Sequence, residues 1–445
     1  MLSEFDNSQV TDMARMFEGD KYLENLDISK FYTKNVKDMS KMFYGLSSIT
    51  SLQVSIFDTS KVTDMSSMFE SCNNLMYIDV SNFKTNEVSR LDSMFKNCNN
   101  LPNIKISNFD TSQVTNLTAM FSGCNSVISL DVSNFDTRNV RYMKELFSEC
   151  YNLEYLNLEN FNTLQITDFT HMFNSCKSLK NLNIANFDTR NATTIFGMFQ
   201  HCESLTSLEV SNFITSQIED MSNTFLYCKS LIYLNIKNWN TSKVMQMDYM
   251  FSGMEKLISI DLSNFETNKT LSMANMFQNC ISLTSIDLNN FNSISLINLY
   301  KMFDSCISLK HIELAKFKTN LATQFGYMFN NCTSLESIDL STFNTQQAYS
   351  MYNMFSECTS LISLDLSNFQ VEKANNMEEM FMNCRSLKNI KFSDKFSTSS
   401  LTALDKMFQG CSSLESLDLS SFDTTAVTNM EWVFSECSSL TYLEI

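Results

Sequence analysis

A strict internal period limits what this chain can fold into more than any other feature. When positions are counted from a leading aromatic residue at offset 0, that aromatic recurs at every twenty-sixth position from Phe5 to Phe422, in seventeen copies. One step, from Phe369 to Phe396, is longer by a single position. Offset 12 is phenylalanine in every copy. A period of this length is typical of a solenoid, in which each repeat is too small to bury its apolar side chains alone and does so by stacking on its neighbours.

Within each repeat the apolar spacing changes from a helical to a strand pattern. In one copy, the residues at helical spacing are Met65, Met68, Phe69 and Cys72. They follow i, i+3, i+4 and i+7, which predicts one face of a short helix. Offset 14, where that helix would end, is glycine or asparagine in nine copies, and both residues tolerate the left-handed conformation.

The second half of the repeat resembles the strand of a leucine-rich repeat. Leu75, Ile78 and Val80 read L-x-x-L-x-L, and the last two alternate with polar positions as a half-buried strand does. We therefore predict an α/β fold, a leucine-rich-repeat solenoid of about 17 coils of 26 residues each. Parallel strands would form one wall and short helices the other. Residues 1–445 are expected to form a single continuous solenoid, a fragment of a longer surface protein.

Residues at one offset should form a column that runs along the stacked coils. All fourteen cysteines occupy offset 15, and Met254 divides this column into two runs of seven, which cannot be paired off between neighbours. Buried free thiols are the expectation, with disulfides as the alternative. Threonine at offset 2, as in Thr59, Thr111 and Thr137, is expected to satisfy backbone groups at a corner. An ice-ordering threonine array is the remote alternative.

The outward residues of the strand wall are the candidate binding surface. Offset 22 is acidic in eleven copies, although aspartate is a poor strand former and like charges on adjacent strands repel. Five consecutive copies carry the acid, and they form the predicted strip Asp261, Asp287, Glu313, Asp339 and Asp365. Two interpretations stay open, a solvated face that keeps the chain soluble or a binding strip for a cationic partner or, more weakly, calcium.

Offset 20 adds tyrosines at even intervals on the same surface. Over the first nine copies this offset repeats every three coils and places Tyr77, Tyr155 and Tyr233 along it. Tyrosine is a favoured contact residue at protein interfaces. We predict that these three residues belong to the binding surface.

Other features exclude several classes of function. The net charge is −17, which disfavours binding to nucleic acid. The sequence contains no apolar run long enough to span a membrane. The three histidines fall at different offsets of different copies, and no phosphate-binding or hydrolase motif is present. We therefore predict no enzyme activity, no cofactor and no structural metal.

The repeat resembles a known family. Ser360–Phe369 reads Ser-Leu-x-Ser-Leu-Asp-Leu-Ser-Asn-Phe, Ser126–Phe135 matches it closely, and Met-x-x-Met-Phe-x-x-Cys follows after a threonine. This pattern is similar to that of the BspA-like leucine-rich repeat surface proteins, along the whole chain. The resemblance implies an extracellular or cell-surface protein that adheres to or recognises a protein or another host or cell-surface ligand. An intracellular interaction scaffold or a secreted effector is the alternative, and an ice- or mineral-binding protein is the remote one.

Overall fold

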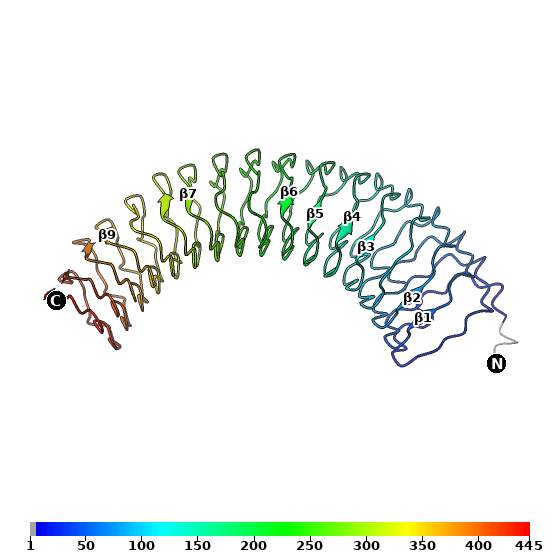
Figure 1. Cartoon of the computed structure of the whole chain (residues 1–445), viewed down its shortest axis with the longest axis horizontal. Coiled ribbons are helices and arrows are strands. Elements are labelled where there is room, and N and C mark those ends of the chain that lie inside the picture. Colours follow the sequence, from blue (N-terminus) through cyan, green and yellow to red (C-terminus); the bar gives the residue numbers. More distant parts are fainter. Residues whose placement is uncertain (1–5) are drawn as a thin grey trace. The chain divides into compact units, whose positions relative to one another are not determined.

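The computed structural model describes residues 6–445. The chain divides into two compact units, with bounds Met1–Gln217 and Ile218–Ile445. In each unit the chain winds into similar coils that lie side by side (Figure 1). Backbone bridges join equivalent positions of successive coils, such as Asp38 and Asp64, and the step from Asn376 to Ala403 includes the one additional position. The spacing of the coils therefore follows the spacing of the aromatics in the sequence. The continuity of one solenoid over 1–445 stays a prediction.

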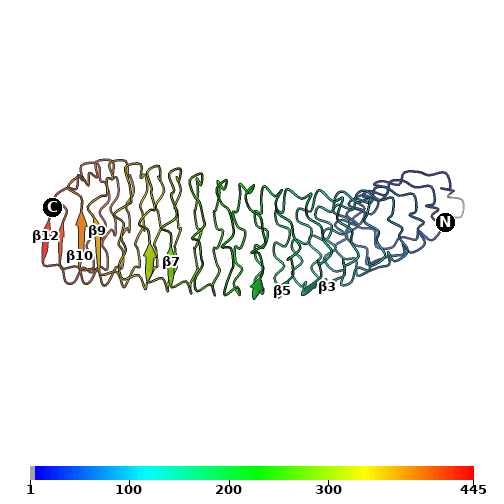
Figure 2. The ribbon, with the colours of Figure 1, turned by 90° about the horizontal axis from the view of Figure 1, so that it is seen from above.

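The strands are short, parallel and paired between successive coils. In the first unit they are β1 (Ser51–Leu52), β2 (Tyr77–Ile78), β3 (Ser129–Leu130), β4 (Tyr155–Leu156), β5 (Asn181–Leu182) and β6 (Ser207–Leu208). In the second unit they are β7 (Ser285–Asp287), β8 (His311–Glu313), β9 (Ser363–Leu366), β10 (Asn389–Phe392), β11 (Ser416–Asp418) and β12 (Tyr442–Glu444). The pairs are β1–β2, β3–β4, β5–β6, β7–β8, β9–β10 and β11–β12, all in parallel register. Figure 2 shows the arrows of β9 and β10 side by side.

The predicted short helices are wrong. Residues 65–72 and their counterparts form a run of turns, and no helix occurs in the described residues 6–445. Inside one coil, Met68 N–H donates to the carbonyl of Met65, and Cys72 N–H donates to that of Phe69. The alternate N–H groups donate instead to the next coil, as in Ser67 to Asp92, Phe69 to Met94 and Ser71 to Lys96. We call this segment, offsets 8–15, the turn wall.

Stacking explains why turns replace the helix. Two of the tight turns in each coil of the turn wall have a positive φ at their third residue, as a type II turn requires; this occurs at offsets 10 and 14, for example at Ser67 (φ 55) and Ser71 (φ 61). A non-glycine residue in that region costs roughly 1–2 kcal/mol. A helix would satisfy its own N–H groups, whereas the turn wall uses half of them to join successive coils. The left-handed residue predicted at offset 14 is confirmed, as at Gly19 (φ 82) and Asn97 (φ 59).

The apolar columns form the interior, as the sequence predicts. Met65, Met68, Phe69 and Cys72 are fully buried, so the inward-facing residues were identified correctly although the local conformation was not. Offset-12 rings stack from coil to coil, with Phe277 and Phe303 at 5.4 Å between ring centroids and Phe303 and Phe329 at 5.7 Å. Such contacts add to the free energy gained by apolar burial.

The cysteine column consists of free thiols, which confirms the prediction. Thirteen of the fourteen cysteines are buried, and Cys437 is partly exposed. Buried thiols in this column donate to a phenylalanine carbonyl of the preceding coil; Cys306 Sγ, for example, donates to the oxygen of Phe277 at 3.1 Å. Burial raises the pKa of the Cys280 thiol to about 12 and that of Cys306 well above its ordinary value.

The threonine column at offset 2 satisfies backbone groups at a corner, as predicted. Thr59 Oγ1 donates to the carbonyl of Lys84 at 3.0 Å and accepts from its N–H at 2.7 Å. Thr59, Thr111 and Thr137 are each 1% exposed. These hydroxyls therefore do not form an array on the surface, which removes the basis of the ice-binding alternative at this offset.

Candidate functional site

The strand face is the exposed side of the strand wall, made by the side chains at offsets 20 and 22. It exists because exposed residues alternate with buried or partly buried ones in the strands before β12, as in β7, where Ser285 and Asp287 face outward around buried Ile286. The backbone that carries these residues is fixed by its pairing with the adjacent coil. Side chains on such a framework are held in place before any partner binds.

Each predicted tyrosine is exposed on this face. Tyr77 is 55%, Tyr155 68% and Tyr233 65% exposed. Tyr77 and Tyr155 both lie in the first unit, three coils apart in the sequence, and each lines a separate shallow hollow. Tyr233 belongs to the second unit, so the structure does not place it beside the other two.

The two hollows have related linings. The smaller one, of about 230 Å³, brings Tyr77 together with Asp79, Asn103 and Lys105. The larger one, of about 500 Å³, combines Tyr155 with Asp131, Asn181 and Lys180, and further residues of the same strands. In both, the coil after the tyrosine supplies an asparagine at offset 20. The two lysines escaped the sequence analysis because they occupy different offsets, 22 and 19, and form no column.

All five acids of the predicted strip are exposed in the second unit. Asp287 and Glu313 are register partners on β7 and β8, so two of the carboxylates lie on adjacent strands. Asp365 pairs in register with Lys391, whose ammonium lies 3.8 Å from the carboxylate. Within residues 6–445 no three His, Cys, Asp or Glu side chains converge as metal ligands would, so calcium binding stays an untested prediction.

The structure gives most of these carboxylates a local role that the sequence analysis missed. One oxygen of each aspartate accepts the N–H of the residue two positions later, as in Ser263 to Asp261 at 3.0 Å, Asn289 to Asp287 at 2.8 Å and Ser341 to Asp339 at 2.9 Å. This bond closes a turn at the end of the strand. Hydrogen bonds from Ser341 hold the pKa of Asp339 below its ordinary value. The small polar residues two positions after each acid were the available signal.

Glu313 departs from this arrangement. The N–H that it would bind, that of Ala315, donates instead to the side-chain oxygen of Asn289 in the preceding coil, at 2.8 Å. Its carboxylate is exposed on β8. Of the strip, Glu313 is therefore the acid with no turn-closing bond to its own coil.

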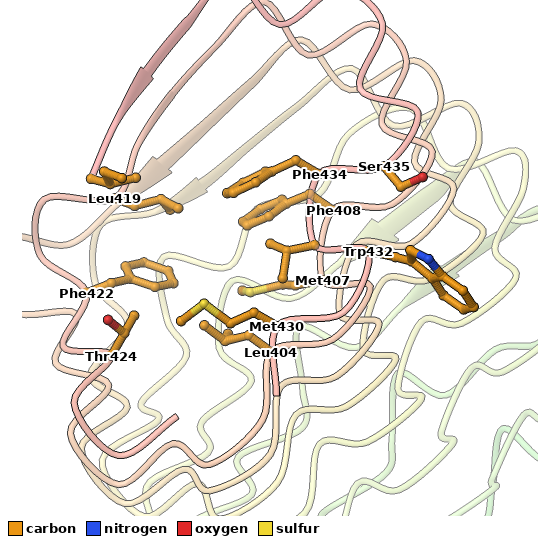
Figure 3. Close-up of a pocket in the computed structure, with 12 residues that line it drawn as sticks. Leu404, Met407, Phe408, Leu419, Phe422, Thr424, Met430, Trp432, Phe434 and Ser435 are labelled. Atoms are coloured by element: carbon orange, nitrogen blue, oxygen red, sulfur yellow. The ribbon is translucent and has the colours of Figure 1, made fainter. Parts of the chain in front are cut away.

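An apolar cavity of about 470 Å³ lies at the last coils of the second unit (Figure 3). Its lining includes Leu404, Met407, Phe408 and Phe434, and the rings of the two phenylalanines stack with 5.8 Å between centroids. These residues occupy offsets 8, 11 and 12, which are buried in other coils. The cavity is thus an opening onto the interior columns.

The three histidines do not form a common site. His171 and His201 have positive φ in turns of the first unit, and His311 is a strand residue of β8 in the second. Burial lowers the pKa of His171, whose ring meets Phe196 edge-on at 5.1 Å. In the described part of the chain, no helix is long and apolar enough to cross a membrane.

Comparison with solved structures returns leucine-rich repeat proteins. A leucine-rich repeat protein from Bacteroides ovatus shows 19% identity and a TM-score of 0.36, with 88% of this chain and 86% of that chain covered. A leucine rich cell surface protein from Faecalibacterium prausnitzii shows 17% identity and a TM-score of 0.28, with 72% and 77% covered. The leucine-rich repeat protein LIC12759 of Leptospira interrogans shows 13% identity and a TM-score of 0.25, with 91% and 95% covered.

No curated protein matches the sequence. One family model does, described as Mycoplasma protein of unknown function, DUF285. It matches in overlapping segments, namely 1–102, 73–157, 92–208, 145–255, 196–311, 230–335, 272–393 and 365–442. Since these segments extend over nearly the whole sequence, this chain belongs to the DUF285 family.

Proposed function

We propose that this chain is a non-catalytic binding protein of the cell surface that recognises a protein or another cell-surface ligand through its strand face. The observation that carries the proposal is the pair of hollows around Tyr77 and Tyr155, in which an exposed ring lies beside carboxylate, amide and ammonium groups. An aromatic ring flanked by polar groups on a rigid surface is typical of a recognition site. The resemblance to BspA-like surface proteins supports the adhesive role and the extracellular location.

Replacing both tyrosines tests this proposal. The double variant Tyr77→Ser/Tyr155→Ser should fold normally, because Ser51 and Ser129 occupy the same offset in neighbouring coils. Labelled protein is titrated onto intact cells and onto purified extracellular proteins. We expect the double variant to raise the half-saturating concentration at least tenfold.

A tyrosine outside the strand face provides the control. Tyr142 lies at offset 7 and is 59% exposed, as much as Tyr77, so Tyr142→Ser removes a similar exposed ring and should leave binding unchanged. Equal loss in both variants, or none in the double variant, would refute the strand-face proposal. Antibody staining of intact and permeabilised cells separates the surface role from the alternative, an intracellular scaffold.

The acidic strip is tested without disturbing its turns. Asn157 and Asn183 occupy the same offset as the acids and accept the same turn-closing bond, at 3.1 and 3.2 Å. The substitutions Asp261→Asn, Asp287→Asn and Asp339→Asn therefore remove charge and keep the turn. If the strip binds a cationic partner, the triple variant should weaken binding and reduce its salt dependence. Unchanged binding would leave the strip as a solvated face.

A further inference from the structure

A second exposed column lies at offset 6, where the chain passes from the corner to the turn wall. In the second unit, four of five successive coils carry an apolar residue at this offset, and the fourth coil carries Thr323 instead. We call Met245, Leu271, Ile297 and Tyr349 the apolar column; they are 39, 37, 43 and 53% exposed. Ile294 and Leu321, at 48 and 51%, lie at nearby offsets of the same coils. Exposed apolar side chains that recur from coil to coil at one offset favour an interaction surface.

The fold itself does not require apolar residues here. In the first unit the same offset holds Thr63, Ser89 and Thr115, and the hydroxyls of all three donate to a carbonyl of the preceding coil. The backbone bonds at this offset are the same in both units; Thr115 N–H donates to Ser89 and Ile297 N–H to Leu271, each at 2.9 Å. The apolar column therefore exposes hydrophobic area that threonine or serine would avoid.

The column is rigid and has a fixed period. Consecutive members are joined by backbone hydrogen bonds of 2.8–2.9 Å, from Leu271 N–H to Met245 through Tyr349 N–H to Thr323. Its side chains consequently recur at the spacing of hydrogen-bonded strands, about 4.8 Å. A surface that interdigitates with such a row needs ridges at the same spacing, and another coil stack of this kind presents them.

The residues of this column can pair with those of a second copy of the column that runs in the opposite direction. Read from the start of the second unit, offset 6 holds Glu219, Met245, Leu271, Ile297, Thr323, Tyr349 and Asn375. When two such columns run antiparallel about Ile297, that residue meets itself and Leu271 meets Thr323. Met245 then meets Tyr349, a favourable sulfur–aromatic pair, and the Glu219 carboxylate meets the Asn375 amide.

We propose that this column is the interface between two copies of the chain, related by a two-fold axis that passes beside Ile297. Such an interface is isologous, because each contact occurs twice. This interface leaves the strand face outside the contact, so the dimer would present two copies of the strand face. The dimer proposal does not rest on the function proposed for the strand face. Each copy carries a net charge of −17, and the repulsion between them should fall as salt rises.

Sedimentation equilibrium of the full chain tests the proposal. The wild type should dimerise reversibly, and more strongly at 0.5 M than at 0.05 M NaCl. The variant Ile297→Lys brings two ammonium groups together at the axis and should leave monomers only. The variant Leu271→Thr/Ile297→Thr, which installs the residue type of the first unit, should raise the dissociation constant at least tenfold. The control Ile258→Lys, at a 51% exposed isoleucine beside the strand face, should dimerise as the wild type does.

Cross-linking tests the geometry independently of affinity. Because thirteen native cysteines are buried, an introduced thiol at the surface is nearly the only reactive one, and the wild type accounts for Cys437. Under mild copper-phenanthroline oxidation, Ile297→Cys should give a covalent dimer, whereas Ile258→Cys should not. A wild type that stays monomeric at 100 µM, or a dimer that Ile297→Lys leaves intact, overturns the proposal. Binding of the monomer to phosphatidylglycerol vesicles through this column would overturn it in favour of a membrane partner.

Discussion

Truncating one ring of the phenylalanine column measures how strongly neighbouring coils stabilise each other. Phe303 is fully buried and lies between Phe277 and Phe329, with centroids 5.4 and 5.7 Å away. Phe303→Ala removes roughly 120 Å² of buried apolar side chain, worth about 3 kcal/mol at about 25 cal/mol per Å². Two lost ring contacts at about 0.5–1.5 kcal/mol each bring the expected cost to about 4–6 kcal/mol.

The matched variant is Phe434→Ala at the same offset of the last coil. Phe434 is partly exposed and stacks on Phe408 alone, at 5.8 Å, among the described rings. We expect a cost of about 1–2 kcal/mol there, since less area and one ring contact are lost.

Hydrogen exchange of the full chain is the suitable assay, because a stack of repeats can lose protection locally without unfolding as a whole. In Phe303→Ala, amides of residues 270–335 should exchange faster, including Phe277 N–H, which bonds to Met302. Residues 30–120 should exchange as in the wild type. If Phe303→Ala costs no more than Phe434→Ala, or if protection falls equally throughout the chain, coil-to-coil stacking does not carry the stability assigned to it.

Three further predictions concern the turn wall, the thiols and the strand face. Gly123→Ala should lower the free energy of unfolding by about 1–3 kcal/mol more than Gly19→Ala. Both residues have positive φ, but an added Cβ at Gly123 would lie 3.2 Å from the backbone Cα of Asn97 as well as 2.4 Å from its Oδ1, whereas nothing lies within 4 Å at Gly19. Equal midpoints in urea for the two variants would contradict this. Native protein at pH 8 should react with Ellman's reagent at no more than about one thiol, that of the partly exposed Cys437, because burial blocks access to the other thirteen and raises the pKa of thiols such as that of Cys306. Rapid reaction of many thiols before urea is added would show that the column is open. Finally, the pKa of Asp261 and Asp339, two of the three aspartates replaced in the triple variant, lies below its ordinary value of 3.8 in the folded chain; their contribution to stability is therefore present above pH 3.8 and is lost as pH falls through the folded pKa. Urea midpoints measured between pH 5 and pH 2 should fall less steeply in the Asp→Asn triple variant, and parallel curves would count against the turn-closing role.

The sequence predicted which side chains are exposed on the strand face, whereas their role in binding stays a prediction. Tyr77, Tyr155 and the acids are all exposed, as the alternation of the strands requires. Sequence periodicity treats a column as one surface, but the structure separates Tyr77 and Tyr155 into two hollows and adds Lys105 and Lys180 to them. Those lysines break the period, so a search for regular columns could not find them.

The sequence by itself determined the coil length, the interior and the strand wall. A constant period places equal offsets one above another, and the apolar offsets then have to face inward because burial is the main driving force. For the same reason the cysteines could be assigned to the interior, because all fourteen occupy one apolar offset. Within the units, a thiol such as that of Cys306 donates to a carbonyl of the coil before it, here that of Phe277.

Only the tertiary structure decided the conformation of the turn wall. The spacing of Met65, Met68, Phe69 and Cys72 fits a helix and a chain of turns equally well, since both bring these side chains to one side. The helix and the chain of turns differ in the acceptors of every second backbone N–H group. The N–H of Phe69, for example, donates to the carbonyl of Met94 in the next coil. That partner is distant along the chain and becomes a neighbour only once the coils are stacked.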